Sequence, residues 1–107
     1  MSLPVIFRKL NTGQIIALFP TRPVGGNSLY TACRGFTAHG DCDMDIGLMR
    51  TTKEAKPHEY TALLIQMAKA GYVDIKPCHR ITGALNAERM HNLRKRQKSH
   101  DLYSMAV

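Results

Sequence analysis

The sequence of 107 residues contains no apolar run that approaches the roughly 20 residues a membrane-spanning helix needs. Its first residues also lack the positive charge and following hydrophobic stretch that mark a secretory signal. The first absence excludes a helical membrane span, and the second gives no sign of secretion. We therefore expect a soluble cytoplasmic protein with no membrane partner.

Cysteine is scarce, and its number is odd. Cys33, Cys42 and Cys78 are too sparse for a disulfide framework, so free thiols in a reducing compartment are the simplest interpretation. Internal repeats and low-complexity segments are also absent. With 44% hydrophobic residues, the chain has the composition and length of one ordinary globular domain.

Acidic residues are few, with 8 Asp and Glu against 15 Lys and Arg, which gives a formal net charge of +7. This excess makes an acidic partner plausible, whether nucleic acid, anionic lipid or an acidic protein surface. A basic composition is also a common solubility device, so charge alone does not choose among these interpretations.

Two apolar runs face each other across a turn near the start of the chain. A three-residue loop over residues 11–13, with Gly13 in the left-handed region, predicts a hairpin in which Leu10 faces Gln14 and Ile6 faces Leu18. The pleat then divides the ribbon into two apolar faces, Val5, Phe7, Ile15, Ala17 and Phe19 on one and Ile6, Ile16 and Leu18 on the other. Such a ribbon is marginal alone, so both faces need cover.

The clearest helix is predicted over residues 57–70. It has Pro57 in its first turn, Gly71 at its end and an apolar stripe formed by Tyr60, Leu63, Leu64, Met67 and Ala68. We expect this stripe to cover the hairpin face that carries Phe7. A fourth strand is predicted over residues 73–76, ended by Pro77.

The patterns between the hairpin and this helix are weaker. They predict a surface loop over residues 21–28, a third strand over 29–38 with Gly35 at a bulge or close backbone approach, and a turn over 39–43. Residues 44–50 fit either a short helical turn or an edge strand.

A second helix, over residues 82–97, is much less apolar and strongly basic. The candidate nucleic-acid-binding residues in and before it are Arg80, Arg89, Arg94, Lys95, Arg96 and Lys98. No aromatic residue that could stack on bases lies between Arg80 and His100, and no motif for sequence-specific recognition is present. Phosphate contacts are therefore the expected mode of binding, and a solvated helix end is the plain alternative.

These elements predict an α+β fold: a small antiparallel β-sheet built on the N-terminal hairpin, covered by one amphipathic helix, plus the basic C-terminal helix. We expect one domain over residues 4–98 and a tail over 99–107. The second hairpin face needs either the last helix or another subunit as cover, and we predict a homo-oligomer because no adequate intrachain cover is evident.

Parts of the sequence resemble a known group of proteins. The segments VIFRK and IIALFP, the His39–Gly40 pair and the run from Met49 to Tyr72 resemble small uncharacterised bacterial proteins associated with conjugative transposons and other mobile elements. This resemblance implies a bacterial accessory protein. It transfers no catalytic residue, because the group has no established activity, and it does not include the basic C-terminal stretch.

Cysteine and histidine form two short groups, Cys33, His39 and Cys42 in one segment and Cys78 and His79 in another. Together they are candidate zinc ligands, although the tight ligand pairs of structural zinc sites are missing and buried thiols with surface histidines are favoured. A cysteine nucleophile with His39 as its base is a further alternative, without any sign of an oxyanion hole. Asp41, Asp43 and Asp45 meet a calcium-loop pattern only loosely, and turn chemistry explains them equally well.

The favoured interpretation is a non-enzymatic binding or adaptor protein of a bacterial mobile element that contacts nucleic acid through its basic helix, with no cofactor. One alternative is a protein-interaction module with an acidic partner. The other is a metal- or thiol-dependent enzyme that uses the cysteine and histidine residues.

Overall fold

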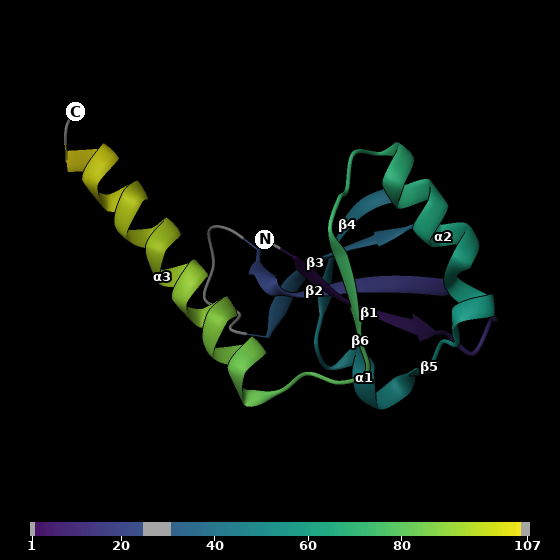
Figure 1. Cartoon of the computed structure of the whole chain (residues 1–107). Helices are drawn as coiled ribbons and strands as arrows, with labels where there is room; N and C mark the ends of the chain where they lie inside the picture. Colours follow the sequence, from purple (N-terminus) through teal and green to yellow (C-terminus); the bar gives the residue numbers. More distant parts are fainter. Residues whose placement is uncertain (1, 25–30, 106–107) are drawn as a thin grey trace.

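The computed structural model describes the backbone of residues 2–24 and 31–105 and the side chains of residues 2–24 and 31–95. The strands are β1 (Leu3–Lys9), β2 (Ile15–Pro23), β3 (Ala32–Thr37), β4 (Gly40–Asp45), β5 (Lys53–Glu54) and β6 (Ile75–Cys78), and the helices are α1 (Leu48–Thr51), α2 (Pro57–Lys69) and α3 (Gly83–Met105). One sheet has the order β4-β3-β2-β1-β5, and β6 pairs with the same edge of β1 as β5 (Figure 1). The predicted α+β class is confirmed.

The hairpin of β1 and β2 has the predicted register, including Ile6 opposite Leu18. Gly13 has a φ of +90°, and its N–H donates to the Leu10 carbonyl at 2.9 Å. The Leu10 N–H in turn donates to the Gln14 carbonyl at 2.9 Å. The left-handed glycine therefore sets which side chains of the ribbon share a face.

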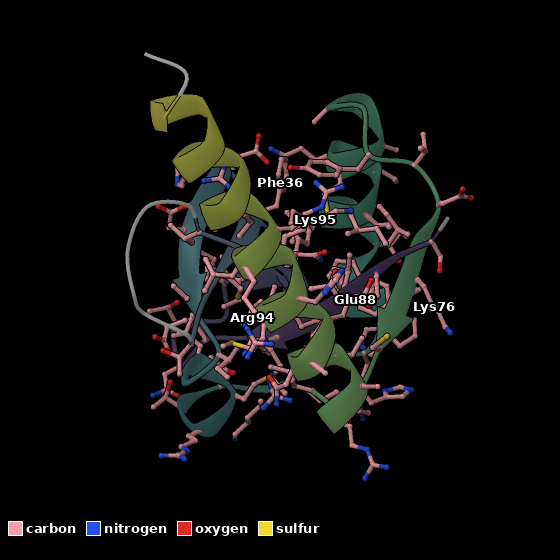
Figure 2. The ribbon with its side chains drawn as sticks, turned by 90° about the vertical axis from the view of Figure 1, so that its left-hand side faces the viewer. Phe36, Lys76, Glu88, Arg94 and Lys95 are labelled. Carbon is pink, nitrogen blue, oxygen red and sulfur yellow. The ribbon has the colours of Figure 1, made fainter. Side chains whose placement is uncertain are left out.

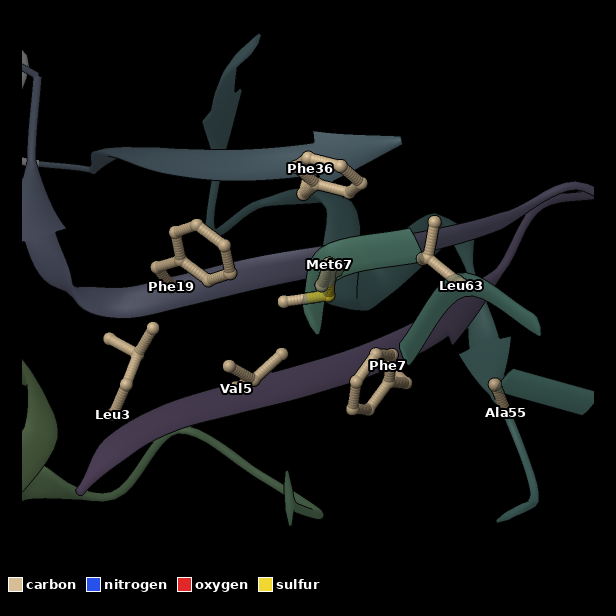
Figure 3. Packing of buried hydrophobic residues seen from close by; sticks show 9 residues of the cluster. Leu3, Val5, Phe7, Phe19, Phe36, Ala55, Leu63 and Met67 are labelled. Atoms are coloured by element: carbon tan, nitrogen blue, oxygen red, sulfur yellow. The ribbon is translucent and has the colours of Figure 1, made fainter. Parts of the chain in front are cut away.

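The first face of the hairpin is covered by α2, as predicted. Leu63 and Met67 are buried against the cluster that contains Val5 and Phe19 (Figure 3). The rings of Phe7 and Tyr60 stack with centroids 4.1 Å apart. Ala68, expected on the same stripe, is exposed.

Both ends of α2 are fixed by local hydrogen bonds. At the start, the Lys56 N–H donates to a carboxylate oxygen of Glu59 at 3.0 Å, beside Pro57 in the first turn. At the end, Gly71 has a φ of +101° and the Tyr72 N–H donates to the Met67 carbonyl at 3.1 Å. This turn directs the Tyr72 ring back onto the sheet.

The second face of the hairpin also has an intrachain cover, so the argument for a homo-oligomer was wrong. Ile6, Ile16 and Leu18 are each at most 3% exposed. Their cover comes from β4, the β4–α1 segment and the residues around β6, namely Met44, Ile46, Leu48, Met49, Cys78 and Ile81. The intrachain cover was not predicted because these apolar residues are scattered through segments whose structure the sequence left open.

Two predicted boundaries near the sheet are corrected, and one predicted close approach is confirmed. β2 continues to Pro23 where a loop was expected, although its register with β3 shifts between Phe19 and Pro23. The expected turn over residues 39–43 is confined to the residues before β4, because Gly40, with a φ of +105°, closes a tight turn into that strand. Gly35 does lie at a close backbone approach, since a Cβ there would be 2.7 Å from the Ala17 carbonyl oxygen.

β6 and α3 also differ from their predicted ranges. β6 runs through Pro77 and pairs with β1 in parallel, whereas a strand ending before Pro77 was expected. The proline is tolerated because β6 forms an edge of the described sheet. α3 continues to Met105, past the expected tail boundary, and its C-terminal part extends away from the sheet (Figure 1). None of the helices described combines the length and apolar character needed to span a bilayer.

Candidate nucleic-acid interface

The predicted basic residues do not form one site. Arg80 lies just before α3 and is exposed, and Arg94 and Lys95 are exposed within the helix. Arg89 is only 3% exposed. The predicted residues Arg96 and Lys98 lie outside the described side chains.

Arg89 is a structural residue, which corrects its predicted role in nucleic-acid binding. Its guanidinium donates to the Pro20 carbonyl at 2.8 Å and to the Asn86 side-chain oxygen at 2.8 Å. One turn further along α3, the Asn92 amide donates to the Thr21 carbonyl at 2.8 Å. The two side chains therefore bind carbonyl groups in the half of β2 where the register with β3 is interrupted.

A basic groove lies where β6 leads into α3. Its volume is about 350 Å³, and its lining consists of Lys76, Cys78, His79, Arg80, Thr82 and Leu85. None of these described lining residues is acidic, although His79 contacts Glu54 of β5 beside the groove. Lys76 and Arg80 make no ion pair with any carboxylate in the described part of the chain.

The N-terminus of α3 adds to the positive potential of the basic groove. The Thr82 hydroxyl accepts a hydrogen bond from the Leu85 N–H at 3.2 Å and so caps the first turn. The aligned peptide dipoles of a helix place partial positive charge at this end. The groove thus combines the cations Lys76 and Arg80 and the imidazole of His79 with the positive end of a helix dipole.

A second concavity, the polar cleft, lies further along α3. Its volume is about 510 Å³, and it is lined by Ser2, Leu3, Thr21, Arg22, Gly71, Tyr72, Val73, Glu88 and Asn92. Its walls therefore come from the start of β1, the end of β2, the α2–β6 connection and α3. Figure 2 shows α3 beside β6, with Glu88 on the side of α3 nearer that strand and Lys76 on β6.

Arg22 and Tyr72 form a layered platform in the polar cleft. The Arg22 guanidinium carbon lies 5.8 Å from the ring centroids of both Phe19 and Tyr72. The Tyr72 ring packs at 5.1 Å from Phe19 and 5.7 Å from Phe36, and its hydroxyl donates to Asp41. Burial, together with the hydrogen bond to Asp41, raises the pKa of the Tyr72 hydroxyl above its usual value. The platform therefore consists of uncharged aromatic rings with the permanently charged Arg22 guanidinium lying over them.

The cysteine and histidine candidates do not converge on a metal site. In the described residues, no group of three or more His, Cys, Asp or Glu side chains is placed to hold a metal ion. Cys33 is buried against the second hairpin face, whereas His39 is exposed in the turn before β4. Cys42 lies on β4, and Cys78 and His79 line the basic groove.

The candidate nucleophile and calcium ligands are placed on the sheet. Burial raises the pKa of the Cys33 thiol to about 11, and burial also raises that of Cys42. Both thiols are therefore held in the less nucleophilic protonated form. Asp41, Asp43 and Asp45 alternate along the exposed side of β4 rather than surrounding a loop, because that segment is a strand.

No protein-family model, curated protein or solved structure matches the chain.

The sequence predicts Arg80 as a phosphate contact and His79 only as a candidate metal ligand, and it does not predict the residues that the fold brings beside them. Lys76 falls in a predicted strand and Arg22 in a predicted loop, and neither Glu88 nor Asn92 is among the predicted site residues. The one available signal was the i, i+4 spacing of Glu88 and Asn92, which places both side chains on one side of a helix.

Proposed function

We propose that the protein is a non-enzymatic nucleic-acid-binding or adaptor protein of a bacterial mobile element, which contacts phosphates through the basic groove. The observation that carries this proposal is a concavity lined by Lys76, His79 and Arg80 and by no carboxylate among its described residues. Phosphate groups are bound by such side chains and by helix N-termini. The mobile-element assignment is supported by the sequence resemblance alone.

Two exposed cations lie further along α3. Arg94 and Lys95 are exposed and make no ion pair with any described carboxylate. Consecutive helical residues leave the axis about 100° apart, so the pair does not form one bidentate site. Separate contacts to a phosphate backbone suit this distribution better than recognition of one compact anion.

The proposal is tested by the affinity of the purified chain for a labelled duplex and a labelled single strand at low salt. We expect Lys76→Ala and Arg80→Ala each to weaken binding to both nucleic acids and to reduce the salt slope by about 1. Lys69→Ala is the matched control, because it removes an exposed cation from α2.

Absence of binding by the wild-type chain would refute the proposal, as would equal effects of all three substitutions. Retention of an acidic protein in a salt-sensitive manner, without affinity for nucleic acid, would favour the interaction-module alternative.

A further inference from the structure

We propose that the polar cleft binds one unpaired nucleobase with N–H donors on its Watson–Crick edge, so that the protein prefers single-stranded nucleic acid. This inference rests on the proposed function, because the phosphates of the same strand would lie in the basic groove. The two concavities are lined by different residues of two common segments, the chain leading through β6 and α3. Val73, before β6, lines the polar cleft, and Lys76, within β6, lines the basic groove. Residues of α3 line both.

The platform supplies the stacking surface that the α3 sequence lacks. Arginine guanidinium planes and aromatic rings both stack on bases in single-strand complexes. Arg22 is exposed on the cleft side and is held over Phe19 and Tyr72 by cation–π contacts rather than by an ion pair with a described carboxylate. Its charge is therefore available to a ligand, and the rings beneath it limit its motion.

The α3 wall presents hydrogen-bond acceptors to the cleft. The Asn92 amide donates one N–H to the Thr21 carbonyl, and its side-chain oxygen is an acceptor. Glu88, four residues earlier, is exposed and lines the cleft with a carboxylate that has only acceptor oxygens when ionised. A ligand that donates N–H groups complements the Glu88 carboxylate on this wall, and guanine offers two adjacent donors to a carboxylate.

The dimensions agree with a short strand that enters both sites. The cleft, at about 510 Å³, is within the size range of small-ligand sites. Leu85 in the groove and Asn92 in the cleft are seven residues apart, roughly 10 Å along the helix axis. A duplex keeps its bases stacked and paired, so only a single strand can place a base in the cleft while its phosphates reach the groove.

The test compares the binding of labelled 8-mers by fluorescence anisotropy. The probes are thymine-only DNA, the same strand with one central guanine, the corresponding uracil-based RNA strands, and a duplex. For the wild-type chain we expect single strands to bind more tightly than the duplex, and the guanine strands to bind about fivefold more tightly than their controls. The DNA and RNA strands identify which nucleic acid is preferred.

Glu88→Gln is the most informative substitution, because it has opposite effects on general phosphate binding and on the preference for guanine. Removal of a negative charge strengthens general phosphate binding, whereas loss of the carboxylate removes the guanine preference. Asp43→Asn is the matched control on β4, which makes the same change in net charge and keeps the preference.

Arg22→Ala weakens single-strand binding about fivefold more than duplex binding, with Lys69→Ala as its charge control. Arg22 and Glu88 are exposed, so the fold is retained.

Three results would overturn this inference while leaving the proposed function intact: equal binding of the guanine and control strands, a guanine preference that survives Glu88→Gln, or tighter binding of the duplex. Absence of any nucleic-acid binding by the wild-type chain would remove both proposals.

Discussion

At the scale of single residues, Arg89 shows how burial changes the meaning of a charge. It belongs to the basic stretch in the sequence, yet its guanidinium is buried and bonded to the Pro20 carbonyl and to Asn86. Removal of such a group leaves a buried carbonyl of β2 without its donor and opens a cavity under α3. Arg89 therefore stabilises the docked helix rather than binding a ligand.

We expect Arg89→Ala to lower the free energy of unfolding by about 2–4 kcal/mol, because charge-assisted buried hydrogen bonds are lost together with packing. Arg94→Ala, at an exposed position of the same helix, should change it by less than about 0.5 kcal/mol. Urea unfolding measures both values. Equal small effects of the two substitutions would contradict the structural role of Arg89.

Cys33 is a second residue whose environment fixes its chemistry. Burial raises the pKa of its thiol to about 11 from a reference value of 9.0. The protonated thiol is therefore favoured in the folded state. Its contribution to stability is complete below pH 9.0 and is lost as the pH rises through about 11.

This environment predicts the order of thiol alkylation in the native protein. With iodoacetamide at pH 8, Cys42 and Cys78 should react while Cys33 stays unmodified, because Cys33 is buried and its thiolate is disfavoured. Peptide mass spectrometry after timed quenching measures each site, and all three thiols should react once urea unfolds the chain. Labelling of native Cys33 as fast as Cys42 would refute this assignment.

At the scale of the elements, the glycine after α2 positions the platform of the polar cleft. Gly71 has a φ of +101°, and a Cβ there would meet nothing within 4 Å, so the cost of a side chain is backbone strain alone. We expect Gly71→Ala to destabilise the fold by about 1–2 kcal/mol. It should also weaken single-strand binding by displacing Tyr72.

Gly83 provides the control for this prediction. It lies at the start of α3 with ordinary helical geometry, and a Cβ there would also meet nothing within 4 Å. Gly83→Ala should therefore be neutral or slightly stabilising in the same thermal-unfolding series. A loss of stability as large as that of Gly71→Ala would show that strain at residue 71 is not the cause.

Comparison of the elements shows which parts of the fold the sequence could predict. The hairpin register followed from the three-residue loop that ends at Gly13, and α2 followed from Pro57, Gly71 and one apolar stripe, because these signals are local. The cover of Ile6 and Leu18 could not be predicted, since Leu48, Met49 and Ile81 come from short segments with no clear period. The approach of Arg22 to Tyr72 is a long-range contact that no local pattern encodes.

At the scale of the whole molecule, the cations behind the net charge of +7 differ in whether they have ion-pair partners. Some cations form ion pairs within the fold. Lys9 pairs with Glu59 at 2.7 Å, and Arg34 pairs with Asp43 at 2.5 Å. Lys76 on β6 and Arg80 just before α3 have no such partner among the described carboxylates. The distribution of unpaired charge, rather than its total, therefore indicates the binding surface.

The most direct measurement is a map of backbone amide chemical shifts as a ¹⁵N-labelled sample is titrated with an unlabelled single-stranded 8-mer. The account predicts that the largest changes fall on residues 71–85, 88 and 92 and on Arg22, with little change on β4 or on the exposed side of α2. Changes centred on β4 or α2, or no change at low salt, would contradict it.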